Sequence, residues 1–142
     1  DDAYVTNFFY RVLSGHNKSI IVAAGLKVSE SRVRRLENLG VRVLKAPNQG
    51  NMLDLKFLLQ RIAKLEISSI LVEGGGTLIG SLFDQRLVDK IYFFIAPKII
   101  GGKTAISSVM GEGIKTIKDA VYLKDLQVKK IGEDYLFEGY VK

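Results

Sequence analysis

One short stretch of this chain combines the residue types that bind phosphate in proteins. Three consecutive glycines, residues 74–76, follow an apolar run at residues 67–72 and are followed by Thr77. Glycine permits positive φ and lets a ligand approach the backbone closely. A helix that begins there offers unpaired N–H groups at the positive end of its dipole. A buried strand that turns through glycines into a helix is therefore a candidate site for a phosphate or pyrophosphate.

The pattern differs from two common phosphate-binding motifs. Ile79 stands where the dinucleotide motif G-x-G-x-x-G has its third glycine, and no Gly-Lys-Ser/Thr sequence follows as in a Walker loop. A tight strand-to-helix turn without any ligand also uses one or two glycines. Three glycines in a row, with Thr77 and Gly80 after them, exceed what such a turn requires. The pattern favours phosphate binding and leaves the purely structural interpretation open.

Glu73 comes directly before the glycines. A carboxylate is an unfavourable neighbour for phosphate groups, so its side chain is expected to face a substrate with hydrogen-bond donors, such as ring N–H groups or ribose hydroxyls. The alternative is a structural cap that accepts hydrogen bonds from backbone N–H groups of an adjacent turn. The residues alone do not decide between these two roles.

Apolar periodicity predicts the elements that position this turn. Strands alternate with helices, which is typical of parallel strands joined by right-handed crossovers. The predicted fold is therefore α/β, with three layers: a mostly parallel sheet and helices on both of its faces. The expected strands are residues 19–24, 41–44, 67–72 and 90–97. One helix is expected from the cap Ser29 to Gly40, one begins at the cap Asp54, and one runs from Thr77 to Leu87. A further short helix is expected in residues 1–17.

The last third of the chain has a different character. Residues 103–119 are expected to form a loop with short helical turns. Residues 122–130 and 134–142 are expected to form two strands of a C-terminal antiparallel hairpin.

Ligands of open α/β sheets bind at the carboxyl ends of the strands. The loop that begins at Ala24 lies at such an end, as does the glycine turn. Small residues there, with Lys27 and Arg32 nearby, suit an adenosine ribose or its 2′-phosphate. An ordinary solvated loop is an equally good interpretation of this segment.

Composition limits the other possibilities. The 142 residues are enough for a single domain with a core. The chain has no cysteine and one histidine, so disulfides, thiolate metal sites and histidine triads are not expected. Its net charge of +6 is not accompanied by a zinc-finger or aromatic RNA-binding signature, and we expect no nucleic-acid partner. With no signal peptide and no apolar run long enough to span a bilayer, we expect a cytoplasmic protein without a membrane partner.

Three ordered motifs resemble one known family. These are Val72-Glu73-Gly74-Gly75-Gly76-Thr77-Leu78, then Leu87-Val88-Asp89, then the strand end Ile95-Ala96-Pro97-Lys98 with Ile99-Ile100-Gly101-Gly102. In this order they closely resemble the C-terminal reductase domain of the bacterial bifunctional riboflavin-biosynthesis deaminase/reductase. The resemblance covers approximately residues 18–142.

The resemblance implies a dihydrofolate-reductase-like fold and an NADPH-dependent oxidoreductase. The family reduces the ribosyl group of 5-amino-6-(5-phosphoribosylamino)uracil, a phosphorylated pyrimidine, to the ribityl form. By this resemblance Glu73 contacts the substrate and Ala24 lies near the adenosine portion of the cofactor. The residues implied to contact the cofactor phosphates are Gly75, Gly76, Thr77, Leu78, Ile79, Gly80 and Ser81.

The chain also departs from the family pattern. A strand with a Ser-Leu-Asp-Gly-like motif and a later strand ending in Asp-Ser do not occur before residue 18. We therefore expect residues 1–142 to be one reductase domain without its first strands, to have little or no activity alone, and to associate as a homodimer through exposed sheet surfaces. Two alternatives remain: a dihydrofolate-reductase-like pterin reductase, and a non-catalytic module that binds phosphate ligands or nucleic acid.

Overall fold

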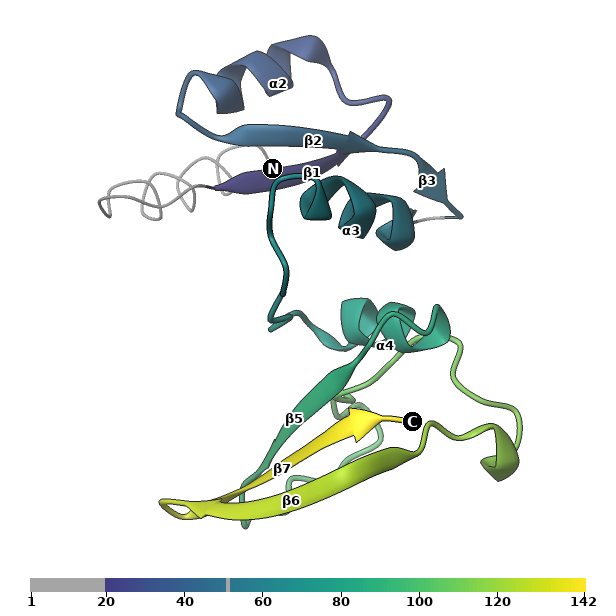
Figure 1. The fold of residues 1–142 in the computed structure, drawn as a ribbon. Helices are drawn as coiled ribbons and strands as arrows, with labels where there is room; N and C mark the ends of the chain where they lie inside the picture. Colours follow the sequence, from purple (N-terminus) through teal and green to yellow (C-terminus); the bar gives the residue numbers. More distant parts are fainter. Residues whose placement is uncertain (1–19, 51) are drawn as a thin grey trace. The chain divides into compact units, whose positions relative to one another are not determined.

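The structure is a computed structural model that describes residues 20–50 and 52–142. The chain divides into two compact units, Asp1–Ser69 and Ile70–Lys142, here called the N-terminal and C-terminal units (Figure 1). Each unit is described by itself. The helix expected in residues 1–17 lies outside the described residues.

The N-terminal unit is built on a pair of parallel strands. Strands β1 (Ile21–Gly25) and β2 (Arg42–Ala46) pair in register, with Ala24 opposite Lys45. The helix α2 (Glu30–Glu37) connects them, and α3 (Leu55–Ala63) follows. Both helices contact β2, and Figure 1 shows them on opposite sides of the strand pair. This strand pair therefore has the predicted parallel arrangement with a helix on each face.

Two of the predicted helix boundaries have clear local causes. Gly40 adopts φ of +79°, a conformation that favours glycine, and its N–H donates to the carbonyl of Glu37 to end α2. Asp54 caps α3, since its Oδ1 accepts a hydrogen bond of 2.9 Å from the N–H of Phe57. Ser29 occupies the N-cap position of α2, but its side chain makes no capping bond to that helix.

The core of the N-terminal unit lies where the helices cover the strands. Its buried side chains come from both helices, from β2 and from the residue before β2. A short antiparallel pair, β3 (Asn48–Gln49) with β4 (Met52–Leu53), follows β2. The buried apolar residues are Val33, Val41, Leu44, Ala46 and Leu55.

The C-terminal unit has one helix followed by an antiparallel sheet. Helix α4 (Gly76–Asp84) precedes β5 (Lys90–Ile95), the short 3₁₀ helix η1 (Ile117–Asp119), β6 (Leu123–Ile131) and β7 (Asp134–Val141). The strand order is β5-β7-β6. The predicted hairpin is confirmed as β6 and β7, and Gly132 begins its turn with φ of +61°.

The prediction of one mostly parallel sheet is wrong for this structure. Residues 67–72 form no strand, and β5 pairs antiparallel with β7 rather than parallel to that segment. The described strands form three small sheets, of which only β1–β2 is parallel. An apolar run indicates an extended segment, but it does not specify which other strand will pair with it. The boundary between the two units along the chain falls within this run, between Ser69 and Ile70.

An ionic cluster joins the three strands of the C-terminal sheet. Glu138 on β7 pairs with Lys90 on β5 at 2.5 Å and with Lys129 on β6 at 2.8 Å. The Lys90 ammonium also lies 4.8 Å and 4.9 Å from the ring centres of Tyr92 and Tyr140. Hydrogen bonds from Lys129 and Lys90 lower the pKa of Glu138 to about 2. Hydrogen bonds to Glu138 and Tyr92 raise the pKa of Lys90 above its ordinary value.

Candidate functional site

The glycine turn forms the amino-terminal end of α4. Gly75 is the N-cap residue, and its carbonyl accepts hydrogen bonds from Leu78 at 3.0 Å and Ile79 at 3.2 Å. The N–H groups of Gly76 and Thr77 have no acceptor within residues 20–50 and 52–142. Two free donors therefore lie at the positive end of the helix dipole, an arrangement suited to an anion.

Packing accounts for two of the four glycines in this segment. A Cβ at Gly76 would overlap the carbonyl of Ser107, and one at Gly80 would overlap the carbonyl of Met110. These two positions therefore exclude larger residues, because main-chain atoms of the same unit lie against them. A Cβ at Gly74 would lie 2.7 Å from Cδ2 of Leu78, a flexible side chain that can move aside.

Gly75 is different because a Cβ there would have nothing within 4 Å. Its φ of −67° and ψ of 166° are accessible to any residue, and the position is exposed. No contact with the described residues requires glycine at position 75. Glycine is an ordinary N-cap residue, and it also lets a ligand approach the backbone closely.

The two hydroxyl residues of the predicted site make contacts within the unit. Thr77 is exposed, and its Oγ1 lies 3.9 Å from the sulfur of Met110. Ser81 Oγ donates to the carbonyl of Thr77 at 3.0 Å. The predicted Leu78 and Ile79 have half-buried side chains, and Gly80 is buried. The structure thus brings the predicted residues 75–81 together on α4, with the backbone of its first turn as the most accessible part.

Glu73 lies in the extended segment just before this turn. Its side chain is exposed and makes no hydrogen bond or ion pair with the described part of the chain. The partner required by the structural-cap interpretation is therefore not found in that part. A free carboxylate beside the turn remains available to a ligand with hydrogen-bond donors.

Ala24 belongs to the other unit. It is half-buried near the carboxyl end of β1, one residue before Gly25. Asn48 lies close to this strand end, with its Oδ1 3.0 Å from the place where a Cβ of Gly25 would be. The exposed Lys27 follows in the next loop. The N-terminal unit thus presents small residues and a cation at the predicted strand end.

Residues 107–113, part of the predicted loop 103–119, lie along α4. We call them the α4 strap. The N–H of Met110 donates to the carbonyl of Gly76 at 3.0 Å, and Asp84 accepts hydrogen bonds from the N–H groups of Glu112 and Gly113. Gly76 and Gly80 are one helical turn apart, a spacing that also indicates close packing of another segment on the helix. The interpretation made from the sequence explained these glycines by a ligand instead.

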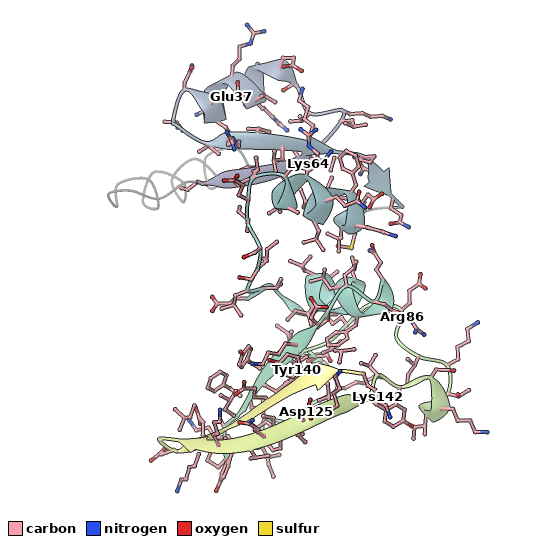
Figure 2. The ribbon with its side chains drawn as sticks, in the orientation of Figure 1. Glu37, Lys64, Arg86, Asp125, Tyr140 and Lys142 are labelled. Carbon is pink, nitrogen blue, oxygen red and sulfur yellow. The ribbon has the colours of Figure 1, made fainter. Side chains whose placement is uncertain are left out.

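The C-terminal unit also has an open cavity of about 990 Å³. Residues of the last turn of α4 and of the strap line it, and Figure 2 labels two of its lining cations, Arg86 and Lys142. None of the residues predicted from the sequence lines this cavity. Its acidic and basic side chains are equal in number, so its charges do not indicate an anion site.

Two further kinds of function, metal binding and membrane spanning, can be compared with the described residues. Within residues 20–50 and 52–142 no group of three or more acidic, histidine or cysteine side chains has an arrangement that would hold a metal ion. Among the helices of these residues, none has the length and apolar character needed to cross a membrane.

Known proteins with similar sequences are named for riboflavin biosynthesis or for reduction of a ribosylamino-pyrimidinone 5′-phosphate. The riboflavin biosynthesis protein RibD of Actinobacillus pleuropneumoniae is 38% identical over 110 residues, which cover 78% of this chain and 29% of that protein. The 2,5-diamino-6-ribosylamino-4(3H)-pyrimidinone 5′-phosphate reductase of Methanothermobacter thermautotrophicus is 35% identical over 134 residues, 94% of this chain and 60% of that reductase. The chain thus spans less than two thirds of the length of each of these relatives.

Solved structures give the same fold. RibD of Acinetobacter baumannii, form 1, matches with a TM-score of 0.67 and 22% identity over 86% of this chain and 31% of the matched one. A pyrimidine reductase-like protein of Corynebacterium diphtheriae matches with a TM-score of 0.63 and 23% identity, over 86% of this chain and 50% of its own. These likenesses confirm an α/β fold of the dihydrofolate-reductase type.

The family model agrees with both comparisons. The RibD C-terminal domain model matches residues 3–137, and so includes residues before 18 that the sequence analysis placed outside the resemblance. The matched region contains the glycine turn, α4, the strap and most of the hairpin. The chain therefore belongs to the RibD C-terminal domain family, within the dihydrofolate-reductase-like superfamily.

Proposed function

We propose that this chain is a reductase domain of riboflavin biosynthesis that uses NADPH. Its substrate would be 5-amino-6-(5-phosphoribosylamino)uracil, whose ribosyl group is reduced to ribityl. Family membership supports this proposal, as do relatives named for riboflavin biosynthesis and for reduction of a ribosylamino-pyrimidinone 5′-phosphate.

The observation that carries the proposal is the open turn at Gly75. It combines a glycine that the fold does not require with the two free N–H donors of Gly76 and Thr77. Such a turn fits the pyrophosphate of a dinucleotide, because a phosphate group can come within hydrogen-bonding distance of both donors. The side chains of Thr77 and Ser81 would lie beside that group, and Leu78, Ile79 and Gly80 would hold the turn in its helical form.

The carboxyl end of β1 is assigned to the adenosine portion of the cofactor. Ala24 and Gly25 are small enough for a ribose to approach the backbone, and Lys27 would favour a 2′-phosphate and hence NADPH over NADH.

The reaction opens the ribose ring. The C1′–O4′ bond breaks as the anomeric carbon accepts a hydride and the ring oxygen accepts a proton. The nicotinamide supplies the hydride when NADPH is bound, while the protein binds and orients the two reactants. Glu73 is assigned to the substrate, where its carboxylate would accept hydrogen bonds from ring N–H or ribose hydroxyl groups.

The pyrimidine can be identified by a turnover assay. Purified protein is mixed with NADPH and either 5-amino-6-(5-phosphoribosylamino)uracil or 2,5-diamino-6-ribosylamino-4(3H)-pyrimidinone 5′-phosphate, and loss of NADPH absorbance is followed. Residues 1–142 are expected to have little or no activity alone, so the assay is run on these residues and on any longer protein that contains them. Where turnover occurs, we expect it with the uracil and with a strong preference for NADPH over NADH. Turnover of the diamino compound alone would contradict the assigned substrate, and turnover of dihydrofolate would favour a pterin reductase. Absence of dinucleotide binding, together with salt-sensitive binding of generic RNA, would contradict the whole proposal.

A further inference from the structure

The α4 strap lies directly against the backbone of α4. Where a Cβ at Gly76 or Gly80 would project, carbonyl groups of Ser107 and Met110 occupy the space. The strap therefore follows the helix from its first turn toward its last, with main chain against main chain. It is also braced internally, since Ser107 Oγ donates to the carbonyl of Val109 at 2.8 Å.

Asp84, the last residue of α4, holds the far end of the strap. Its Oδ2 accepts a hydrogen bond of 2.8 Å from the N–H of Glu112, and its Oδ1 accepts one of 3.2 Å from Gly113. A carboxylate at the carboxyl end of a helix faces the negative end of the dipole, which is unfavourable. Two backbone donors from another segment offset that cost. These contacts make Asp84 an anchor for the strap.

Met110, in the middle of the strap, contacts the glycine turn. The Met110 N–H donates to the carbonyl of Gly76, and the Met110 sulfur lies 3.9 Å from the Thr77 hydroxyl. Gly76 and Thr77 are the residues whose own N–H groups have no acceptor in the described part of the chain. The Gly76 carbonyl that accepts from Met110 belongs to the same peptide group as the Thr77 N–H, so the strap directly contacts the peptide of one of the two donors and the residue that carries the other.

We propose that Asp84 is a positioning residue for the cofactor-binding turn and acts on it through the α4 strap. This inference rests on the function proposed above. Without the two hydrogen bonds at Asp84 the strap loses its fixed end, and the contact of Met110 with Gly76 loosens. The free N–H donors then sample more orientations, and a bound pyrophosphate must order them at a cost in affinity.

The test compares variants of the purified protein by NADPH titration, steady-state kinetics and thermal melting. Asp84→Ala should raise the dissociation constant and the KM for NADPH at least fivefold, with kcat at saturating NADPH within twofold of the unchanged protein. Asp84→Asn keeps one acceptor oxygen and should recover a large part of the affinity. Asp119→Ala is the control, since it removes a carboxylate that accepts a hydrogen bond from Thr116 and not from the α4 strap.

A second pair of variants perturbs the strap without changing a charge. Gly111 and Gly113 both have positive φ, +98° and +68°. A Cβ at Gly111 would meet Asp84 and Gly80, whereas a Cβ at Gly113 has nothing within 4 Å. Gly111→Ala should therefore weaken NADPH binding as Asp84→Ala does, both through the clash and through the greater backbone strain at φ of +98°, and Gly113→Ala should weaken it much less. This pair also serves if Asp84→Ala does not fold.

Hydrogen exchange separates the failure of this inference from failure of the proposed function. Asp84→Ala should speed exchange of the Met110 amide at least tenfold in the absence of any cofactor. Unchanged exchange, or unchanged NADPH affinity in a folded Asp84→Ala variant, would overturn the inference even if the unchanged protein binds NADPH. If the unchanged protein binds no NADPH, the proposed function fails and the cofactor role of Asp84 fails with it.

Discussion

At Gly75 the requirements of folding and of ligand binding point in opposite directions. Asp is among the best N-cap residues, and its negative charge is favourable at a helix amino terminus. The open space and ordinary backbone angles at Gly75 allow an Asp side chain to reach the first-turn N–H groups. The same carboxylate would repel a phosphate group and occupy its donors.

We therefore expect Gly75→Asp to stabilise the fold by about 0.5–1 kcal/mol while lowering NADPH affinity at least a hundredfold. Gly75→Asn is the matched control: it caps the helix without a charge and should cost less affinity. Melting temperature and dinucleotide titration measure the two effects. A Gly75→Asp protein that melts higher and binds NADPH normally would exclude this turn as the phosphate site.

Glu73 gives a second prediction at the scale of single residues. Since it has no partner among the described residues, Glu73→Gln should leave the melting temperature within about 1 °C of its original value. If the carboxylate binds substrate, kcat/KM should fall at least tenfold while NADPH affinity is kept. Calorimetry beside steady-state kinetics decides between the roles, and a large loss of stability with normal kinetics would restore the structural-cap interpretation.

The helices show how far local sequence determines an element. Asp54 and Ser29 are both typical cap residues, but only Asp54 makes a side-chain capping bond. Asp54→Ala should therefore destabilise the protein by about 1 kcal/mol, and Ser29→Ala by only a few tenths. Urea unfolding of the two variants measures the difference. Equal losses would mean that the Ser29 hydroxyl caps α2 in solution.

The ionic cluster of the C-terminal sheet gives a pH dependence. The pKa of Glu138 is lowered from 4.5 to about 2, so its contribution to stability is present above pH 4.5 and is lost as the pH falls toward 2. Glu138→Gln removes this contribution, and melting temperature should depend less on pH in that interval. Glu133→Gln, at the turn of the same hairpin, is the control and should keep the original dependence. Identical pH profiles for Glu138→Gln and the unchanged protein would mean that the cluster is not formed in solution.

Sequence predicted the elements better than their pairing. Caps, turn glycines and alternating residues are local signals, which is why Gly40, Asp54 and the hairpin were placed correctly. The pairing of β5 with β7 depends on residues 40 to 50 positions apart, from Ile95 with Tyr135 to Lys90 with Tyr140, and no local pattern encodes it. At the site, the position of the glycine turn was predictable. The strap was not, because glycines at positions 76 and 80 indicate only that something approaches α4 closely, and they do not identify residues 107–113 as the segment that does so.

For the whole molecule, the open sheet predicts self-association. β5 and β6 are the outer strands of their sheet, and Phe94 on β5 is 60% exposed. Exposed apolar side chains on an edge strand favour contact with a second copy. We expect light scattering to give twice the mass of the 15.8 kDa chain, and Phe94→Glu to shift the protein toward the monomer. Lys56→Glu, an exposed charge change on α3, should leave the dimer intact. A monodisperse monomer at all concentrations would contradict this prediction.

The close packing of the strap on α4 has a consequence for evolution. Gly76 and Gly80 would be retained by selection for a folded domain even in a descendant that had lost its cofactor, since any side chain at either position meets main-chain atoms. Glycines at these two positions in a distant homologue would then indicate common ancestry, but they would not indicate that the homologue binds a cofactor. Position 75 is free of that constraint. In a family member that no longer binds a dinucleotide, we therefore expect position 75 to be the first of these glycines to be replaced by another residue.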